Sequence, residues 1–157
     1  GMTVQGRILQ TAFWLLLIVG LVGCSGPSAI KFKGNIKTSP DGNPDPAGRP
    51  SPVVVRIYLL RSPGPFLNAD FFDLYDNATA TLGQNLIIWE EVELRPGEAR
   101  EFNTKIDIAT KYVGVLAAYR DLENSRWREL VTLPDKKKVH LNIKLNSLAV
   151  SVSTGEH

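Results

Sequence analysis

Residues 139–146 read Val-His-Leu-Asn-Ile-Lys-Leu-Asn, and apolar and polar side chains alternate there without a fault. Successive side chains of a β-strand point to opposite faces of the sheet, so this stretch predicts a strand with one buried and one solvated face. Asn146-Ser147 should then form a tight turn into a last strand over Leu148–Val152.

Two other stretches are apolar enough to be strands in the middle of a sheet. In Val53–Leu60, written VVVRIYLL, β-branched residues dominate and every second side chain is apolar. Tyr112–Tyr119, written YVGVLAAY, has no polar face, which is typical of a strand buried on both sides. A buried helix is the alternative for so short a run, but Gly114 and the flanking turn signals favour a strand.

Turn signals divide the rest of the chain into further short strands. Arg95-Pro96-Gly97-Glu98 has the pattern of a type II turn, which predicts that the strand after it runs back antiparallel. The remaining strands are expected over Ile30–Lys37, Ile87–Leu94, Ala99–Ile106 and Trp127–Leu133. With about eight short strands, the sequence predicts an all-β protein, a two-sheet β-sandwich.

A helical insert is expected between the second and third strands. Apolar residues fall at helical spacing over residues 71–75 and can cover one side of a sheet. Asn68 should cap this helix, with Leu67 and Phe72 packed together as a hydrophobic staple. Asn77 should cap a second short turn that stops at Gly83.

The connection Thr38–Pro52 holds five of the chain's ten prolines. Proline removes backbone donors, so we expect a loop of extended character. The loop is long for a connection between strands, and such loops are often functional.

The N-terminus reads as an export signal. Arg7 precedes the apolar run Ala12–Val22, which is too short for the roughly 18 residues of a membrane span. Leu21-Val22-Gly23-Cys24 closes the run and resembles the bacterial lipobox, in which the signal is cut before an acylated cysteine. The alternative is an ordinary signal peptide with a stray cysteine. We expect a signal peptide over 1–23 (Gly1, before Met2, being a cloning remnant), a lipidated tether over 24–29 and the sandwich over 30–157.

Composition narrows the chemistry. Residues 24–157 carry 17 basic and 16 acidic side chains, a balance that gives no electrostatic case for nucleic acid or for an acidic surface. Cys24 is the only cysteine, so no disulfide, zinc cluster or cysteine nucleophile is expected once it is acylated. No cofactor is expected beyond the covalent lipid on Cys24.

No motif favours catalysis. Asp41-Gly42-Asn43-Pro44-Asp45 matches the opening of a calcium loop, but Pro46 and Pro52 stand where the glycine and the bidentate glutamate are needed. His140 lies on the polar face of its strand, which favours a solvated histidine over a base or ligand. Two acidic sets are read as solvated faces, with a paired catalytic function as the alternative: Asp70, Asp73 and Asp76, and Glu90, Glu91 and Glu93.

Five stretches in order behind the lipobox resemble one family, the outer-membrane lipoproteins of bacterial type VI secretion systems (TssJ or SciN). They are RPSPVVVRIYLL at 49–60, ADFFDLY at 69–75, LRPGE at 94–98, YVGVLAAYRD at 112–121 and WR at 127–128. The resemblance implies a transthyretin-like sandwich with a small helical insert and no enzymatic activity.

The same resemblance implies a place and a partner. The lipid would fix the domain to the outer membrane, facing the periplasm, and Ser25 agrees because an aspartate there would usually signal inner-membrane retention. The domain would bind the periplasmic C-terminal part of the inner-membrane protein TssM. In this family the loop between the first two strands contributes to that contact. Here that loop is Thr38–Pro52, and within it we expect Asp41, Gly42, Asn43, Pro44, Asp45 and Arg49 to contact the partner.

Two other functions remain open from the residues alone. A lipid-anchored binding module for a small ligand or sugar would need a pocket with exposed aromatic residues, around Trp89 or Trp127. Both tryptophans are more typical of core or rim packing. An envelope hydrolase would need a clustered acid pair or a paired His140.

Overall fold

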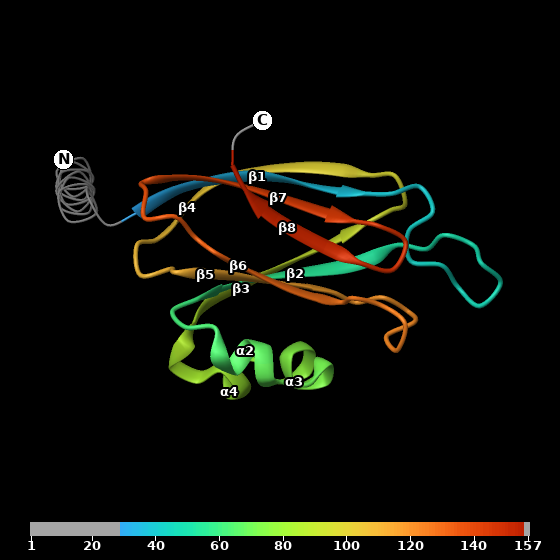
Figure 1. Cartoon of the computed structure of the whole chain (residues 1–157), viewed down its shortest axis with the longest axis horizontal. Coiled ribbons are helices and arrows are strands. Elements are labelled where there is room, and N and C mark those ends of the chain that lie inside the picture. The colour runs from blue at the N-terminus through green and yellow to red at the C-terminus, as the bar shows by residue number, and fades with distance from the viewer. Residues whose placement is uncertain (1–28, 156–157) are drawn as a thin grey trace, which may run out of the picture.

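The computed structural model describes residues 29–155, which form two four-stranded sheets packed face to face (Figure 1). The expected signal peptide (1–23), Cys24 and the part of the expected tether up to residue 28 lie outside the described residues. The first sheet has the order β4-β1-β7-β8 and the second the order β3-β2-β5-β6. The strands are β1 (Ala29–Thr38), β2 (Val53–Leu60), β3 (Leu86–Leu94), β4 (Ala99–Asp107), β5 (Tyr112–Ala117), β6 (Arg128–Thr132), β7 (Lys138–Leu145) and β8 (Val150–Thr154). The predicted sandwich of eight strands is confirmed.

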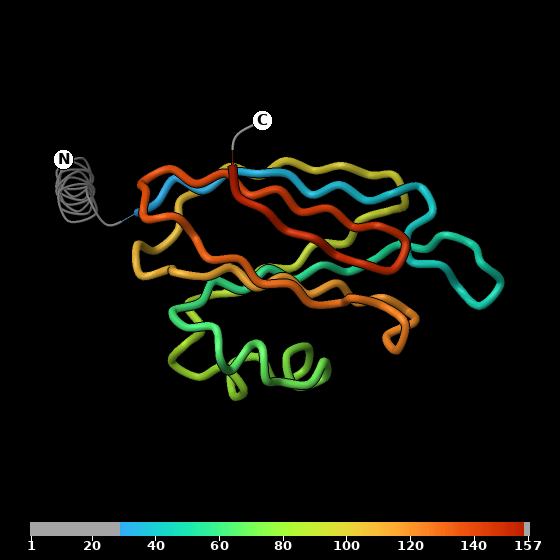
Figure 2. Tube along the Cα trace, viewed as in Figure 1, coloured from blue at the N-terminus to red at the C-terminus, as the bar shows by residue number. Residues whose placement is uncertain are grey.

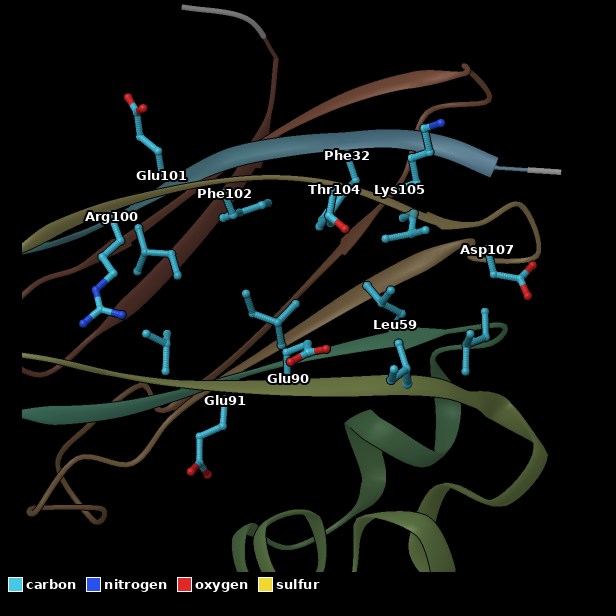
Figure 3. A pocket seen from close by; sticks show the side chains of 16 residues that line it. Phe32, Leu59, Glu90, Glu91, Arg100, Glu101, Phe102, Thr104, Lys105 and Asp107 are labelled. Carbon is cyan, nitrogen blue, oxygen red and sulfur yellow. The ribbon is translucent and has the colours of Figure 1, made fainter. Parts of the chain in front are cut away.

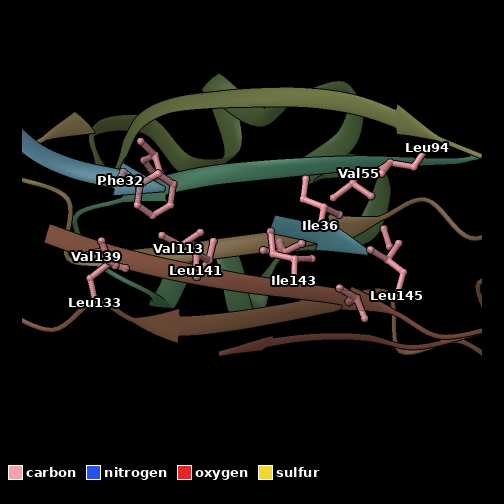
Figure 4. Packing of buried hydrophobic residues seen from close by; sticks show 14 of the residues in the cluster. Phe32, Ile36, Val55, Leu94, Val113, Leu133, Val139, Leu141, Ile143 and Leu145 are labelled. Atoms are coloured by element: carbon pink, nitrogen blue, oxygen red, sulfur yellow. The ribbon is translucent and has the colours of Figure 1, made fainter. Parts of the chain in front are cut away.

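The core lies between the sheets, where every second side chain points inward (Figure 4). On β7 the four apolar residues of the alternating stretch are all buried, and they face Val55 of β2 and Val113 of β5. Removing each such side chain from water contributes roughly 1.5–3 kcal/mol. The strict alternation therefore fixes which face of β7 turns inward.

Strand β5 is buried on both faces because a second apolar cluster lies on the other side of its sheet. Val113 and Val115 point into the sandwich, whereas Leu116 points toward the insert. A Cβ atom built on Gly114 would meet the ring of Phe66 at 2.7 Å, so the glycine allows the insert to approach the strand. The prediction of a fully buried strand is confirmed.

The turn after β3 has the expected geometry but a different role. The amide of Glu98 donates to the carbonyl of Arg95 at 3.0 Å, and Gly97 has a φ of +77°, as a type II turn requires. However, β4 pairs with β1 rather than returning along β3. At the crossing, the single hydroxyl proton of Thr38 is shared between the carbonyls of Arg95 and Glu98, which lie 2.8 and 2.9 Å away, and this holds the turn against the end of β1.

The insert comprises α2 (Gly64–Asn68), α3 (Phe71–Asp76), α4 (Ala78–Leu82) and the 3-10 turn η1 (Gly83–Asn85), and it covers the outer face of the second sheet (Figure 1). The prediction that Asn68 caps a helix is wrong. Helix α2 begins earlier, with proline in its first turn, and ends at Asn68. Leu67 and Phe72 are exposed, so the staple is also wrong, whereas Asn77 and Gly83 bound α4 as expected.

Two arginines of the second sheet hold this insert. Arg128 donates to the carbonyls of Phe66 and Ala69 at 2.8 and 2.6 Å. The guanidinium of Arg56 lies 4.1 Å from the ring centre of Tyr75 and 4.2 Å from that of Trp89, and it donates to the carbonyl of Tyr75. These contacts satisfy carbonyls at helix ends, which otherwise lack partners.

The two ends of β1 lie at opposite ends of the sandwich. Ala29, where the described chain begins, is at one end, and the loop Ser39–Pro52 projects from the other (Figure 2). At about 3.3 Å per residue, the ten residues of β1 separate them by roughly 30 Å. No helix within residues 29–155 is long and apolar enough to span a bilayer.

Candidate partner-binding loop

The loop Ser39–Pro52 is a hydrogen-bonded structure rather than an extended one. Its start is fixed by the amide of Ser39, which donates to the carbonyl of Leu145 at 2.9 Å. Its two branches are joined by the amide of Ser51, which donates to the carbonyl of Gly42 at 3.1 Å. The expectation of extended character is therefore only partly right, because the prolines alternate with tight turns.

Asn43 connects the loop to two other segments of the chain. Its side chain is buried, donates to the carbonyl of Pro52 at 2.7 Å and accepts from the amide of Arg120 at 2.8 Å. Its own amide donates to the carbonyl of Ser147 at 2.9 Å. Its φ of 51° is in the left-handed region, which asparagine tolerates better than most residues. Asn43 therefore fixes the position of the whole loop.

The loop tip is a turn organised by the carboxylate of Asp45. One carboxylate oxygen accepts from the amides of Ala47 and Arg49, both at 2.9 Å, and the other accepts from Nε of Arg49 at 3.1 Å. The bond from the Arg49 amide, the largest cause, lowers the pKa of Asp45. This capping explains the aspartate of the calcium-like motif without a cation. Among residues 29–155, no three His, Cys, Asp or Glu side chains are grouped so that they could hold a metal ion.

The structure divides the six predicted contact residues into two groups. Gly42 and Asn43 are buried and shape the loop, so neither residue is presented to a partner. Asp41 and Arg49 are exposed, the latter with 80% of its side chain in solvent, while Pro44 and Asp45 are partly exposed. We define the loop tip as residues 44–49.

The sequence analysis missed a neighbour of the loop tip. Arg120 and Asp121, which follow β5, line a surface hollow together with Pro44, Asp45 and Pro46. The pairing of β2 with β5 places the end of the loop beside this segment, and the hydrogen bond from the Arg120 amide to Asn43 joins the two. Nothing local in the sequence indicates this neighbourhood.

A separate cleft opens between the edge strands β3 and β4 (Figure 3). Its volume is about 650 Å³, within the usual range for ligand pockets, and apolar residues such as Leu59 and Phe102 form much of its lining. Register places Glu90 opposite Ile57 and Arg100 opposite Ile36, so both charged residues point inward from the edges. The other side of the sandwich is closed, since Arg126 bridges to the segment before β8.

The residues considered for the other functions are dispersed. Trp89 packs on Arg56 and Trp127 packs on Phe71, and neither lines the cleft. Consecutive residues of a strand face opposite ways, so Glu90 points into the cleft while Glu91 binds Arg56 on the far face at 2.8 Å. Asp70, Asp73 and Asp76 are exposed on the insert. The Nε2 atom of His140 is buried without a hydrogen-bond partner among the described residues.

Comparison with known proteins shows which family has this sequence and fold. A family model described as "Type VI secretion lipoprotein, VasD, EvfM, TssJ" matches residues 31–148. The crystal structure of the type VI lipoprotein TssJ1 from Pseudomonas aeruginosa is similar, with a TM-score of 0.78 and 35% identity over 83% of this chain and 99% of that one. No curated protein sequence matched.

Two more distant structures share the fold. Serratia marcescens Lip, described as a membrane-bound component of the type VI secretion system, matches with a TM-score of 0.74 and 24% identity over 81% of this chain and 98% of that one. A chain of the structure described as the TssM C-terminal domain (869-1107) from EAEC matches with a TM-score of 0.62 and 24% identity, over 83% of this chain and 99% of that one.

Proposed function

This chain belongs to the type VI secretion lipoprotein family and is a component of the type VI secretion membrane complex, and we propose that its loop Ser39–Pro52 binds the periplasmic C-terminal domain of TssM. The observation that carries the proposal is the hydrogen-bonded, exposed loop tip, which lies at the end of the sandwich opposite the start of β1 (Figure 1). The role is one of binding, and no catalytic step is part of it.

The position of the loop suits a lipid-anchored protein. We propose that Cys24 is acylated and that the lipid lies in the outer membrane, with the domain in the periplasm. Residues 24–28 span at most about 17 Å when extended, so the start of β1 would stay close to that membrane. The loop would then point away from it, toward a protein that reaches across from the inner membrane (Figure 2).

The hydrogen bonds of the loop give it a physical advantage in binding. Ordering a flexible segment costs roughly 1–2 kcal/mol per residue in backbone entropy. Asn43 and Asp45 already hold the loop in one conformation, so little of this cost remains when a partner binds. Arg49 is exposed at the loop tip, and Arg120 is exposed in the lining of the hollow beside it. We propose that both arginines contact acidic or carbonyl groups of the partner.

A binding titration between residues 25–157 and the TssM periplasmic domain of the same organism tests this. The segment contains both apolar clusters, and the crystallised P. aeruginosa relative consists almost wholly of the matching part. Arg49→Glu should weaken binding at least tenfold if Arg49 is a central contact. The matched control is Arg61→Glu, another exposed arginine in a loop at the other end of β2. Equal effects of both variants, or no effect of either, would refute the loop as the contact site.

The cleft between β3 and β4 supports a second candidate, the binding of a small apolar ligand. Fatty acids and detergents are suitable probes because the lining is largely apolar. Saturable binding that is lost in Val92→Asp, with TssM binding unchanged, would support this second function. Native mass spectrometry without any bound small molecule, together with no binding of either probe, would exclude it.

A further inference from the structure

We propose that the surface where β1 and β7 begin binds the anionic headgroups of phospholipids, and so orients the sandwich on the membrane that holds its tether. We call this the basic end. It consists of Lys31, Lys33, Lys105, Lys136, Lys137 and Lys138.

A row of three lysines crosses the first sheet at the basic end. Lys31 of β1 pairs with Lys105 of β4 on one side and with Lys138 of β7 on the other. Ile30 and Phe32 point into the core, so Lys31 and its two partners point outward on the same face. Like charges directly opposite each other on neighbouring strands destabilise a sheet. An anionic ligand would remove that repulsion.

No ion pair within the described residues relieves this charge. The three salt bridges of residues 29–155 are Arg49–Asp45, Arg56–Glu91 and Arg100–Glu98, and none includes a lysine. The acidic residues nearest in the chain or register are Asp107, opposite Ala29, Glu101, two residues along β4 from the partner of Lys33, and Asp135 in the turn before β7. Six lysines thus stand against three carboxylates. The nearly equal numbers of basic and acidic side chains in the whole chain do not reveal this local excess of lysine.

Two hollows in the surface of the basic end can accept small anionic groups. One hollow is lined by Lys31, Lys33, Lys136–Lys138 and His140, whose Nε2 atom is buried and makes no hydrogen bond within the described part of the chain. A second hollow lies on the other side of the lysine turn and includes Ile108, an exposed apolar residue. Lysine ammonium groups with an apolar neighbour match the boundary between headgroups and acyl chains.

The position of the basic end selects a membrane over other anionic partners. Lys31 is two residues from Ala29, where the tether enters, and the turn carbonyl of Lys137 accepts from the amide of Lys31 at 2.7 Å. The proposed lipid attachment at Cys24 determines only which membrane the basic end contacts. The charge arrangement itself is a property of the sandwich.

Vesicle binding by residues 25–157, which lack the lipid, tests the proposal independently of TssM. Vesicles of phosphatidylcholine with phosphatidylglycerol should bind the protein more tightly than vesicles of phosphatidylcholine alone. Lys31→Gln with Lys138→Gln should lower the partition coefficient about 30-fold, because each lysine near an anionic surface contributes about 1 kcal/mol. Lys136→Gln with Lys137→Gln, in the exposed turn, should have the same effect.

The chain provides a matched control on the same two strands. Lys37 and Lys144 also pair directly across β1 and β7, six residues further along, or roughly 20 Å away. That is about two Debye lengths, so Lys37→Gln with Lys144→Gln should change partitioning less than about threefold. Equal losses in both pairs would mean a net-charge effect and overturn the proposal. So would equal binding to the two vesicle types, or a loss of TssM binding rather than vesicle binding in the first pair.

Discussion

Asn43 accepts a hydrogen bond at 2.8 Å from the backbone amide of Arg120, a residue 77 positions later in the chain. The bond joins the loop after β1 to the segment after β5, and residues of both segments line the hollow beside the loop tip. The proposed binding surface therefore depends on a buried side chain that does not itself face the partner.

Asn43→Ala should lower the free energy of unfolding by about 2–3 kcal/mol. The substitution removes both side-chain hydrogen bonds, leaves the Arg120 amide without its partner and places alanine at a φ of 51°. Urea denaturation measures the change. Asn43→Gly should recover about 1 kcal/mol, because glycine adopts positive φ without strain. An alanine variant as stable as the wild type would contradict the role given to this residue.

Gly114→Ala should destabilise the fold by about 1–3 kcal/mol, because the added methyl group would meet the ring of Phe66. Phe66→Leu alone should also destabilise, since it leaves a space in the second cluster. The double variant should be more stable than the sum of the two losses predicts, and thermal unfolding of all four proteins gives this coupling. Strict additivity would mean that the insert does not press on β5.

The tip turn should resist acid. The hydrogen bond from the Arg49 amide lowers the pKa of Asp45 below 3.8, so its stabilising effect is complete above that value and is lost only as pH falls through the lower folded pKa. The amide signals of Ala47 and Arg49, followed by NMR, should titrate with a midpoint below 3.8. Asp45→Asn should abolish this titration. A midpoint at or above 3.8 would show that the carboxylate does not hold the turn.

Glu90 and Arg100 should keep the open edges from pairing with other molecules. Natural sheets protect exposed edges with inward-pointing charges, and both residues point into the cleft from edge strands. Glu90→Val should therefore promote dimers or larger species, seen by light scattering after size-exclusion chromatography. Glu93→Val makes the same charge change on the opposite face of β3 and should leave the protein monomeric. If Glu93→Val self-associated and Glu90→Val stayed monomeric, the charge that protects the edge would lie on the outer face of β3, which would contradict the role given to Glu90.

The alternation of apolar and polar residues predicts β7 and β2 directly, whereas β5 was predicted from its uninterrupted apolar run and the last strand, expected from Leu148, begins at Val150. In β7 and β2 a one-residue shift in register would turn the whole apolar face toward solvent. The pattern therefore determines which side chains point inward. The partner sheet of β4 was not predictable in this way. A type II turn is compatible with either sheet. The pairing of β4 with β1 and the contacts of Thr38 at the turn join segments that are distant in sequence.

The site was predictable as a segment but not residue by residue. Proline content marked the loop, yet it does not distinguish an inward asparagine from an outward one. The buried position of Asn43 depends on Pro52, Arg120 and Ser147, which converge only in the folded chain. The basic end was missed for a similar reason, because lysines from β1, β4 and β7 gather only when the sheet forms.

Site-specific photo-crosslinking in intact cells tests the central claim most directly. A photoreactive residue replaces Ala47 at the loop tip in one strain and Ala80 on α4 in another, two exposed alanines at distant places. We expect a crosslinked product containing TssM from position 47 and none from position 80. A TssM product from position 80 without one from position 47 would contradict the assignment of the loop as the partner-binding site.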